Sequence, residues 1–331
     1  MTHKPRFELF AASYTPEGGI CRYLLSDDGK LTHVGSIPMD RPMYFQKQGD
    51  RLHVILRAPE GFDGNSAYLC CNAYGDRADL QDAVSTDGIV ACHLSVIGDD
   101  VYAVNYLSGN LVHVGKKTVA HEATPDCKPG RQDAPHTHCV IPSPDGRYLL
   151  CTDLGLDKIR VYDRALNFVS ECAAPRGCGV RHIVFSHDGR YLYAANELDS
   201  SVSAYEYAEG HLTLLSTVSS EVTCPHNLTA AIRLSPDGTR LYVSQRGEDI
   251  VSVFEVQNGA QLRLIAKIAC GGCSPRDMFL SPDGRLLVTA NEKSGELAVL
   301  RIDGDTATVT DTVPLVGALC VYIEEIKEGS I

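Results

Sequence analysis

The sequence predicts an all-β protein with the architecture of a seven-bladed β-propeller, closed by pairing of the N- and C-terminal strands. Three features carry this prediction. A hairpin pattern recurs at nearly constant spacing, further strand-like runs follow each hairpin, and an unmatched strand-like run lies near each end of the chain. The helical periodicity of apolar residues is nearly absent, which argues against a helical or mixed fold.

The hairpins are marked by an Asp-Gly turn between two apolar runs, which is a strong hairpin signal. Four strong copies, such as "IPSPDGRYLLCTDLG", are preceded by two weaker ones. The aspartates of the strong turns and then of the weaker turns are Asp145, Asp188, Asp237, Asp283, Asp50 and Asp99. The strong turns are 43, 49 and 46 residues apart, and runs such as "KIRVYD" and "HLTLLSTV" fill the intervals. Four short strands in such an interval are typical of a propeller blade.

Two runs have no partner in this pattern. The run "FELFAAS" near the N-terminus reads as a second strand with no first strand ahead of it, and "ALCVYIEEI" near the C-terminus has no turn after it. Pairing the two completes a seventh blade and leaves no open sheet edge at the closure. We therefore expect one domain over residues 1–331, in which the long segment 116–135 is a loop between blades.

Composition restricts the partners and the compartment. The formal charge is −12 and no run of Lys and Arg is present, so a nucleic acid or an anionic membrane surface is not an expected partner. No segment approaches the roughly 20 apolar residues of a membrane span, and we read no secretory signal at the N-terminus. The thirteen cysteines are odd in number and irregular in spacing, which predicts reduced thiols and a cytoplasmic protein.

Charged residues collect where the predicted inner strands begin and where the second strands end. In a propeller these positions converge on one mouth of the ring, and charges there are costly unless they are paired or used. The pooled candidates are His136, His138, Asp153, Arg181, His182, Glu197, His226, Arg246, Arg276 and Glu292. The sequence therefore predicts a functional site at this mouth.

Several motifs together resemble the propeller lactonase family, which includes bacterial 6-phosphogluconolactonases and fungal carboxy-muconate cyclases. They include "PHTHCVIPSPDGRYLLCTDLGLDKIRVY", "VRHIVFSHDGRYLYAANELDSSVSAYEY" and "SPRDMFLSPDGRLLVTANEKSGELAV". The resemblance spans the chain and is strongest from about residue 134 to 303. It implies hydrolysis of a small anionic sugar-acid lactone in carbohydrate metabolism, with 6-phosphogluconolactone of the pentose phosphate pathway as the leading substrate, by a monomer or weak homodimer without a metal or other cofactor.

The resemblance also implies the roles of the site residues. His138, Arg181 and Glu197 are the expected catalytic residues. Arg246 and Arg276 are the substrate-binding residues that the resemblance implies, and the converging strand ends add His182 and His226 to them. Either Glu197 or His138 is expected to act as the base on an attacking water, while arginines stabilise the oxyanion and hold a phosphate or carboxylate. Val180 replaces the family's Pro and Gln245 its Asn, which leaves the charged groups in place and changes the pocket around them.

Other interpretations remain open from the sequence. The same acid, base and anion clamps would suit a cyclase that closes a lactone, and a propeller can also serve as a non-catalytic binding scaffold. Glu197 and Arg181 could form only a structural ion pair. A metal chelate by His136 and His138, on one face of a strand, is disfavoured because the neighbouring strands supply arginines. The Cys-x-x-Cys of Cys270 and Cys273 lacks the helix or second cysteine pair that redox or zinc sites use.

Overall fold

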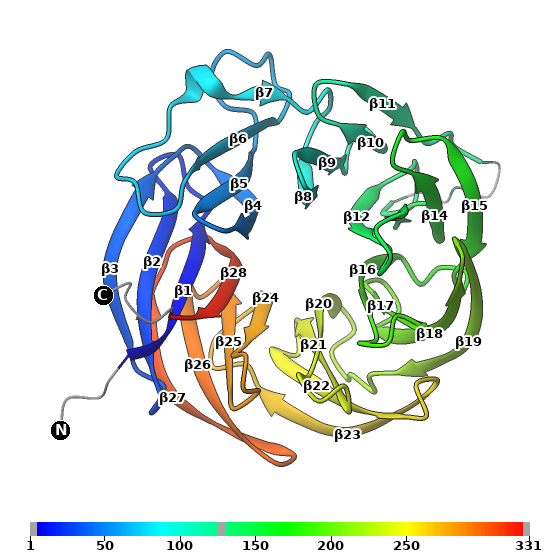
Figure 1. Cartoon of the computed structure of the whole chain (residues 1–331). Helices are drawn as coiled ribbons and strands as arrows, with labels where there is room; N and C mark the ends of the chain where they lie inside the picture. Colours follow the sequence, from blue (N-terminus) through cyan, green and yellow to red (C-terminus); the bar gives the residue numbers. More distant parts are fainter. Residues whose placement is uncertain (1–4, 125–126, 128–129, 327–331) are drawn as a thin grey trace.

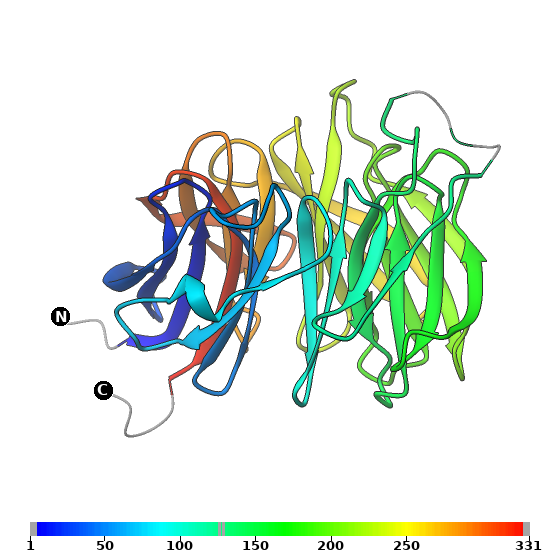
Figure 2. The same ribbon diagram turned by 90° about the horizontal axis from the view of Figure 1, so that it is seen from above.

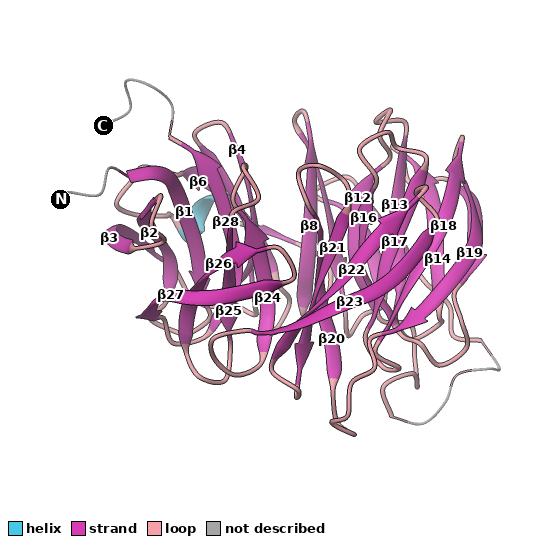
Figure 3. Cartoon of the chain, turned by 90° about the horizontal axis from the view of Figure 1, so that it is seen from below, coloured by secondary structure: helices cyan, strands magenta, loops and turns pink. Residues whose placement is uncertain are grey.

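The computed structural model describes residues 5–124, 127 and 130–326, which form seven four-stranded antiparallel sheets arranged around a common axis (Figure 1). The predicted seven-bladed propeller is therefore confirmed. Strands and turns make up almost all of these residues, and the helix drawn among them is the short 3-10 segment η1 (Leu80–Asp82) (Figure 3). Within the same ranges, no helix is long and apolar enough to cross a membrane.

Each blade runs from an inner strand beside the axis to an outer strand at the rim, and the strands run between the two faces of the ring (Figure 2). The inner strands are β4 (Pro42–Gln48), β8 (Ala91–Ile97), β12 (Thr137–Pro142), β16 (Val180–Phe185), β20 (Leu228–Leu234), β24 (Pro275–Leu280) and β28 (Ala318–Glu325). The second strands are β5 (Arg51–Leu56), β9 (Asp100–Asn105), β13 (Tyr148–Asp153), β17 (Tyr191–Asn196), β21 (Arg240–Arg246), β25 (Leu286–Asn291) and β1 (Pro5–Ser13).

The outer half of each blade contains a third and a fourth strand. The third strands are β6 (Ala67–Asn72), β10 (Asn110–His113), β14 (Lys158–Asp163), β18 (Ser201–Ala208), β22 (Ile250–Gln257), β26 (Glu296–Asp303) and β2 (Gly19–Ser26). The outermost strands are β7 (Val84–Ser85), β11 (Lys117–Ala120), β15 (Phe168–Ala173), β19 (His211–Ser219), β23 (Gln261–Ala269), β27 (Thr306–Pro314) and β3 (Leu31–Pro38). The blades are numbered here from blade 1 (β28, β1–β3) through blade 2 (β4–β7) to blade 7 (β24–β27).

The ring closes in blade 1 as the sequence predicts. The C-terminal β28 is its innermost strand and pairs antiparallel with the N-terminal β1, with Phe7 opposite Glu325 and Ala11 opposite Val321. Because the last strand of the chain is hydrogen-bonded to the first, both ends of the described chain are held by a sheet ladder.

The repeated Asp-Gly turns are architectural. In each strong copy a serine two residues ahead of the aspartate donates its hydroxyl to that carboxylate, as Ser143 does to Asp145 at 2.5 Å. The same contact recurs at Asp188, Asp237 and Asp283 at 2.5 to 2.6 Å. The following glycine has positive φ, as at Gly146 (φ 67°), a conformation that glycine adopts without strain.

Apolar side chains on facing sheets of neighbouring blades form the cores. Phe7 and Leu9 of β1, for example, pack in one cluster with Leu286 and Val288 of β25, and all four are essentially inaccessible to solvent. Burial of each such side chain contributes about 1.5–3 kcal/mol. These clusters fix the blades against one another, so the strand ends at the axis are held at rigid, defined positions.

Candidate active site

Each inner strand carries an irregularity near its first residues, at the face of the ring that we call the mouth. In β12, Thr137 pairs with Asp153 and Cys139 with Thr152, so His138 is a bulged residue without a partner. Corresponding register shifts place five further residues at such positions, namely Met43, Cys92, Arg181, Arg276 and Leu319. A bulge redirects the side chain that it contains. All six side chains line one narrow cavity on the axis, the axial cavity.

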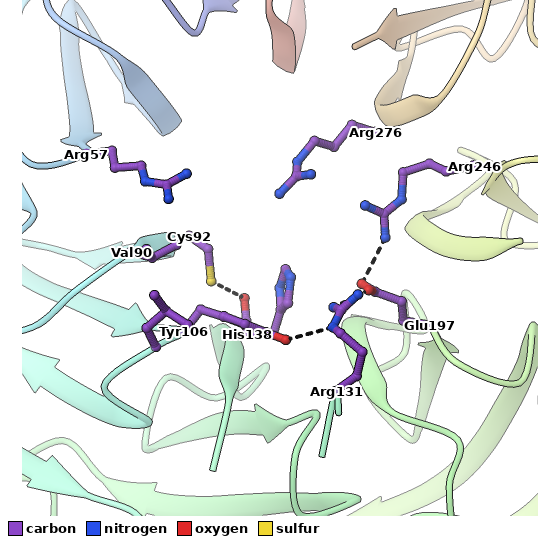
Figure 4. Close-up of a pocket in the computed structure, with 10 residues that line it drawn as sticks. Arg57, Val90, Cys92, Tyr106, Arg131, His138, Glu197, Arg246 and Arg276 are labelled. Carbon is purple, nitrogen blue, oxygen red and sulfur yellow. Dashed lines mark hydrogen bonds and ion pairs between the residues drawn. The ribbon is translucent and has the colours of Figure 1, made fainter. Parts of the chain in front are cut away.

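A larger cavity of about 270 Å³, here called the mouth cavity, shares Cys92, His138 and Arg276 with the axial cavity. Its lining is formed by Arg57, Val90, Cys92, Tyr106, Leu107, Arg131, His138, Glu197, Arg246 and Arg276 (Figure 4). Four of these residues are arginines and one is a carboxylate. The predicted His138, Glu197, Arg246 and Arg276 are therefore brought together, and the wall carries the positive charge that an anionic ligand requires.

Glu197 is the hub of the charged network. It follows β17, is 1% exposed, and accepts a hydrogen bond from Arg131 Nη2 on Oε1 at 2.6 Å. Its Oε2 lies 2.9 Å from both Arg181 Nε and Arg246 Nη2. Burial raises the pKa of Glu197, but the charges of Arg246, Arg181 and Arg131 outweigh it and lower the pKa to about 2. Glu197 is therefore ionised at neutral pH and has little tendency to take up a proton.

Arg181 lies beneath the mouth cavity, with a side chain 4% exposed. It lines the axial cavity, and its Nη1 donates to the carbonyl of Ala230 at 2.8 Å. Its Nε lies close to Glu197, but the angle does not allow a hydrogen bond. The contact between Arg181 and Glu197 is therefore an ion pair without a hydrogen bond. Burial and the neighbouring Arg246 lower the pKa of Arg181 to about 9, which leaves the group charged at neutral pH.

His138 differs from its charged neighbours because its ring nitrogens have no hydrogen-bond partner among the described residues, and Nδ1 is buried. The ring packs edge-on against Tyr106 and His182, with centroids 5.7 and 5.4 Å away. Burial, and then the charges of Arg181 and Arg276, lower its pKa well below 6.5. The imidazole is consequently neutral, and a nitrogen is available to accept a proton from a bound water.

The other predicted residues have different surroundings. Arg276 Nη1 contacts Glu292 at 3.2 Å at the rim. His182 is buried in the axial cavity and does not line the mouth cavity. His226 is exposed in the loop before β20 and lines neither cavity, so its role in substrate binding stays a prediction.

The expected shared face of His136 and His138 is not formed either. His136 lies just before β12, and its ring stacks on Tyr106 while Nδ1 bonds the Tyr106 carbonyl at 3.0 Å and Nε2 contacts Asp133 at 3.1 Å. Asp153 accepts hydrogen bonds from the His136 backbone at 2.9 Å and from His121 at 2.6 Å. His136 and Asp153 therefore hold the start of β12 in place, and the bulge turns His138 alone into the cavity.

Metal and thiol chemistry have little support in the geometry. Among the residues that the structure describes, no group of three His, Cys, Asp or Glu side chains is placed to bind a metal ion. Cys270 and Cys273 are both free thiols, and burial raises the pKa of Cys270 to about 11. Cys92, in the mouth cavity wall, donates to the His138 carbonyl at 3.3 Å, and burial raises its pKa to about 12. A thiol with so high a pKa is a poor nucleophile.

Sequence reasoning missed Arg57, Tyr106 and Arg131. Arg57 and Tyr106 directly follow β5 and β9, the same position that Glu197 occupies after β17. Applying the strand-end rule to the two weaker hairpin copies would have found both of them. Arg131 lies in the long loop between blades 3 and 4 and reaches Glu197 from 66 positions away in the sequence, so no local pattern indicates it.

Fold and site together define a propeller with a small, arginine-rich cavity at one mouth, whose lining includes a neutral histidine and an ionised carboxylate. The model of the family described as "Lactonase, 7-bladed beta-propeller" matches residues 8–322 of the chain. The chain therefore belongs to the seven-bladed β-propeller lactonase family. The likeness to this family expected from the sequence motifs is thus confirmed over nearly the whole chain.

Relatives and solved structures agree with this membership. An uncharacterized protein of Staphylococcus aureus (strain bovine RF122 / ET3-1) is 30% identical over 316 residues, covering 92% of this chain and 85% of that protein. A Lactobacillus plantarum protein is 28% identical with a TM-score of 0.86, and the match covers 96% of this chain and 99% of that one. The periplasmic gluconolactonase PpgL of Pseudomonas aeruginosa is 25% identical with the same TM-score and the same coverage.

Proposed function

We propose that the protein hydrolyses the ester bond of a small anionic sugar-acid lactone, with 6-phosphogluconolactone as the leading substrate. The observation that carries the proposal is the neutral imidazole of His138, which has no hydrogen-bond partner on its ring in the described part of the chain and lies in a cavity lined by four arginines. Attack of water on an anionic ester requires a base whose nitrogen is free to accept a proton. It also requires several cations that attract the substrate and stabilise the oxyanion. The similarity to the P. aeruginosa gluconolactonase supports the same chemistry.

In the proposed reaction a water held by His138 attacks the lactone carbonyl. The imidazole accepts the proton from this water as the new carbon–oxygen bond forms, and the carbonyl electrons move onto the oxygen. Arginines of the cavity wall stabilise this oxyanion. When the oxyanion reforms the carbonyl, the bond to the ring oxygen breaks, and the imidazolium of His138 returns its proton to that oxygen. The product is an open hydroxy acid whose carboxylic proton is released to solvent.

Glu197 has a positioning role in this proposal rather than that of the base. Both of its oxygens contact guanidinium groups, and its pKa of about 2 is too low for efficient proton abstraction at neutral pH. Its charge holds Arg181 and Arg246 in defined orientations and offsets part of their repulsion. A bound anion would likewise offset the arginine charges that lower the pKa of His138, which makes the imidazole a stronger base when substrate is present.

The direct test is a panel of substrates, with the acid released on ring opening followed at constant buffer capacity. The panel contains 6-phosphogluconolactone, the same lactone without phosphate, and carboxy-cis,cis-muconate. We expect fast hydrolysis of at least one of the two lactones and no conversion of the muconate to a lactone. Consumption of the muconate alone would replace hydrolysis by the cyclase function, and inactivity on the whole panel would favour a binding scaffold.

We expect exhaustive chelation to leave the hydrolytic rate unchanged. The proposed site holds its anionic substrate with guanidinium groups, and both ring nitrogens of His136 already have protein partners. The rate is measured after dialysis against a chelator and again after divalent ions are added back. A loss that a divalent ion restores would contradict the metal-free site.

The pH profile of kcat/KM is expected to be flat through pH 6.5. An ordinary histidine has a pKa of about 6.5, whereas burial, Arg181 and Arg276 lower the pKa of His138. The neutral ring is the active form of a base, so activity is present above the lowered pKa and falls only as the pH drops through it. Initial rates are measured down to pH 5 with spontaneous hydrolysis subtracted. An acid limb centred at or above pH 6.5 would contradict the assignment of His138.

We further propose that the protein acts in the reducing environment of the cytoplasm, as a monomer or weak homodimer. All thirteen cysteines are free, and several are buried in the blade cores. A protein with so many unpaired thiols is suited to a compartment in which thiols stay reduced.

A further inference from the structure

Arg57 is held at the mouth cavity by contacts that fix its direction. It follows β5 in blade 2, and its Nη1 donates to the hydroxyl of Tyr14 at 3.0 Å while the guanidinium lies 5.9 Å from the centroid of that ring. Its backbone nitrogen donates to the carbonyl of Arg41 at 3.1 Å. An arginine fixed in this way loses little conformational entropy when it binds a ligand.

The charge of Arg57 is not balanced by the protein in the way that the other cavity arginines are. Arg131 and Arg246 contact Glu197, and Arg276 contacts Glu292. Arg57 has no carboxylate partner among the described residues, although the chain as a whole carries a formal charge of −12. A cation of this kind in a cavity wall is complementary to an anionic group on the ligand.

The positions of the side chains show where that group would lie. Arg57 stands on the wall opposite Glu197 and Arg246, Arg276 extends toward it from blade 7, and His138 lies between the two walls (Figure 4). An anion held between Arg57 and Arg276 would therefore leave the remainder of the ligand above His138. Glu197 already balances part of the charge of Arg131 and Arg246, whereas Arg57 has no carboxylate partner among the described residues, so the side of the cavity at Arg57 is the stronger anion site.

We infer that Arg57, positioned by Tyr14, binds the phosphate of the substrate together with Arg276 and so determines preference for a phosphorylated lactone. This inference rests on the proposed lactonase function. Two guanidinium groups offer several N–H donors in planar forks, which match the three oxygens and the charge of a phosphate dianion better than a single carboxylate. Arg57 is thus a specificity-determining residue on the wall of the cavity opposite Glu197 and Arg246 (Figure 4).

The test compares Arg57→Ala, Arg57→Lys and Tyr14→Phe on 6-phosphogluconolactone and on the lactone without phosphate. We expect Arg57→Ala to raise KM for the phosphorylated lactone by about 10–100-fold, with an effect on the plain lactone at least tenfold smaller. Arg57→Lys should lie between wild type and alanine because a point charge replaces a fork. Tyr14→Phe should show a smaller loss in the same direction.

Arg51→Ala is the matched control. Arg51 begins the same strand, β5, is exposed, and lies at the opposite end of that strand from Arg57, so both lactones should be turned over normally. Inorganic phosphate binding, measured by calorimetry on the free protein, gives a second readout, and its Kd should rise at least about tenfold in Arg57→Ala. Thermal melts establish that each variant is folded.

Equal losses on both lactones, or an unchanged Kd for phosphate in Arg57→Ala, would overturn the inference. A loss confined to a lactone that carries a carboxylate and no phosphate would also overturn it. If the wild type hydrolyses no lactone but still binds phosphate through Arg57, the proposed function fails while the anion site is supported. The two hypotheses therefore fail by different measurements.

Discussion

Replacement of His138 by alanine is expected to lower kcat on the best lactone by about 10²–10⁴-fold, the usual contribution of a general base. His138 is the one titratable side chain of the mouth cavity that is neutral at neutral pH and has no described hydrogen-bond partner on its ring. The alanine variant should fold, because the bulge at this position is fixed by the backbone pairs Thr137–Asp153 and Cys139–Thr152 rather than by the imidazole. Steady-state kinetics and a thermal melt measure both quantities.

A partial recovery of the rate on addition of free imidazole to His138→Ala would identify a missing base rather than a distorted cavity. His226→Ala is the matched control, because His226 is exposed and lies outside both cavities. We expect it to retain full activity. A dead His226 variant beside an active His138 variant would show that the reaction occurs elsewhere on the ring.

The propeller could be predicted because its signals are local. The Asp-Gly turn, with its serine two residues earlier, is specified within a few positions, as at Ser143 and Asp145. Closure of the ring follows by counting, since one run at each end lacks a partner. The grouping of His138 with Arg181 and Glu197 also follows, because antiparallel pairing brings the start of each inner strand to the end of the second strand.

The details of the site depend on features without a sequence pattern. Strict alternation along a strand would place His136 and His138 on one face, but the bulge at His138 interrupts that alternation. Arg131 reaches Glu197 from a long loop, where no strand register exists to predict its direction. His226 lies two residues ahead of β20, in an exposed loop where no strand register predicts the direction of its side chain.

Glu197→Gln is expected to lower kcat by about 10²-fold or more, because the arginines that it orients would shift from their positions. The substitution keeps the shape of the side chain but removes the charge that Arg131, Arg181 and Arg246 contact. Glu292→Gln is the matched comparison, since Glu292 occupies the same place after β25 and contacts only Arg276 among the arginines. Its effect should be much smaller.

The double variant His138→Ala/Glu197→Gln separates positioning from direct proton transfer. If Glu197 orients the arginines for the reaction in which His138 is the base, the loss of kcat in the double variant should be much smaller than the product of the losses in the two single variants. If instead Glu197→Gln is inactive while His138→Ala retains most of the wild-type rate, then Glu197 is the base. Near wild-type rates for both single variants would show that the reaction does not take place in this cavity.

The free energy of unfolding should depend on pH because of the ion pairs between Glu197 and its arginine partners. The pKa of Glu197 is lowered from 4.5 to about 2 in the folded protein, so its contribution is fully present above pH 4.5 and is lost as the pH falls toward 2. Removing one partner of a buried ion pair costs about 3–5 kcal/mol. We therefore expect Glu197→Gln to be less stable than wild type by about this amount at pH 7, and the difference to narrow between pH 4.5 and 2. Denaturant unfolding at several pH values measures it, and a difference that stays constant with pH would mean that the charge of Glu197 does not stabilise the fold.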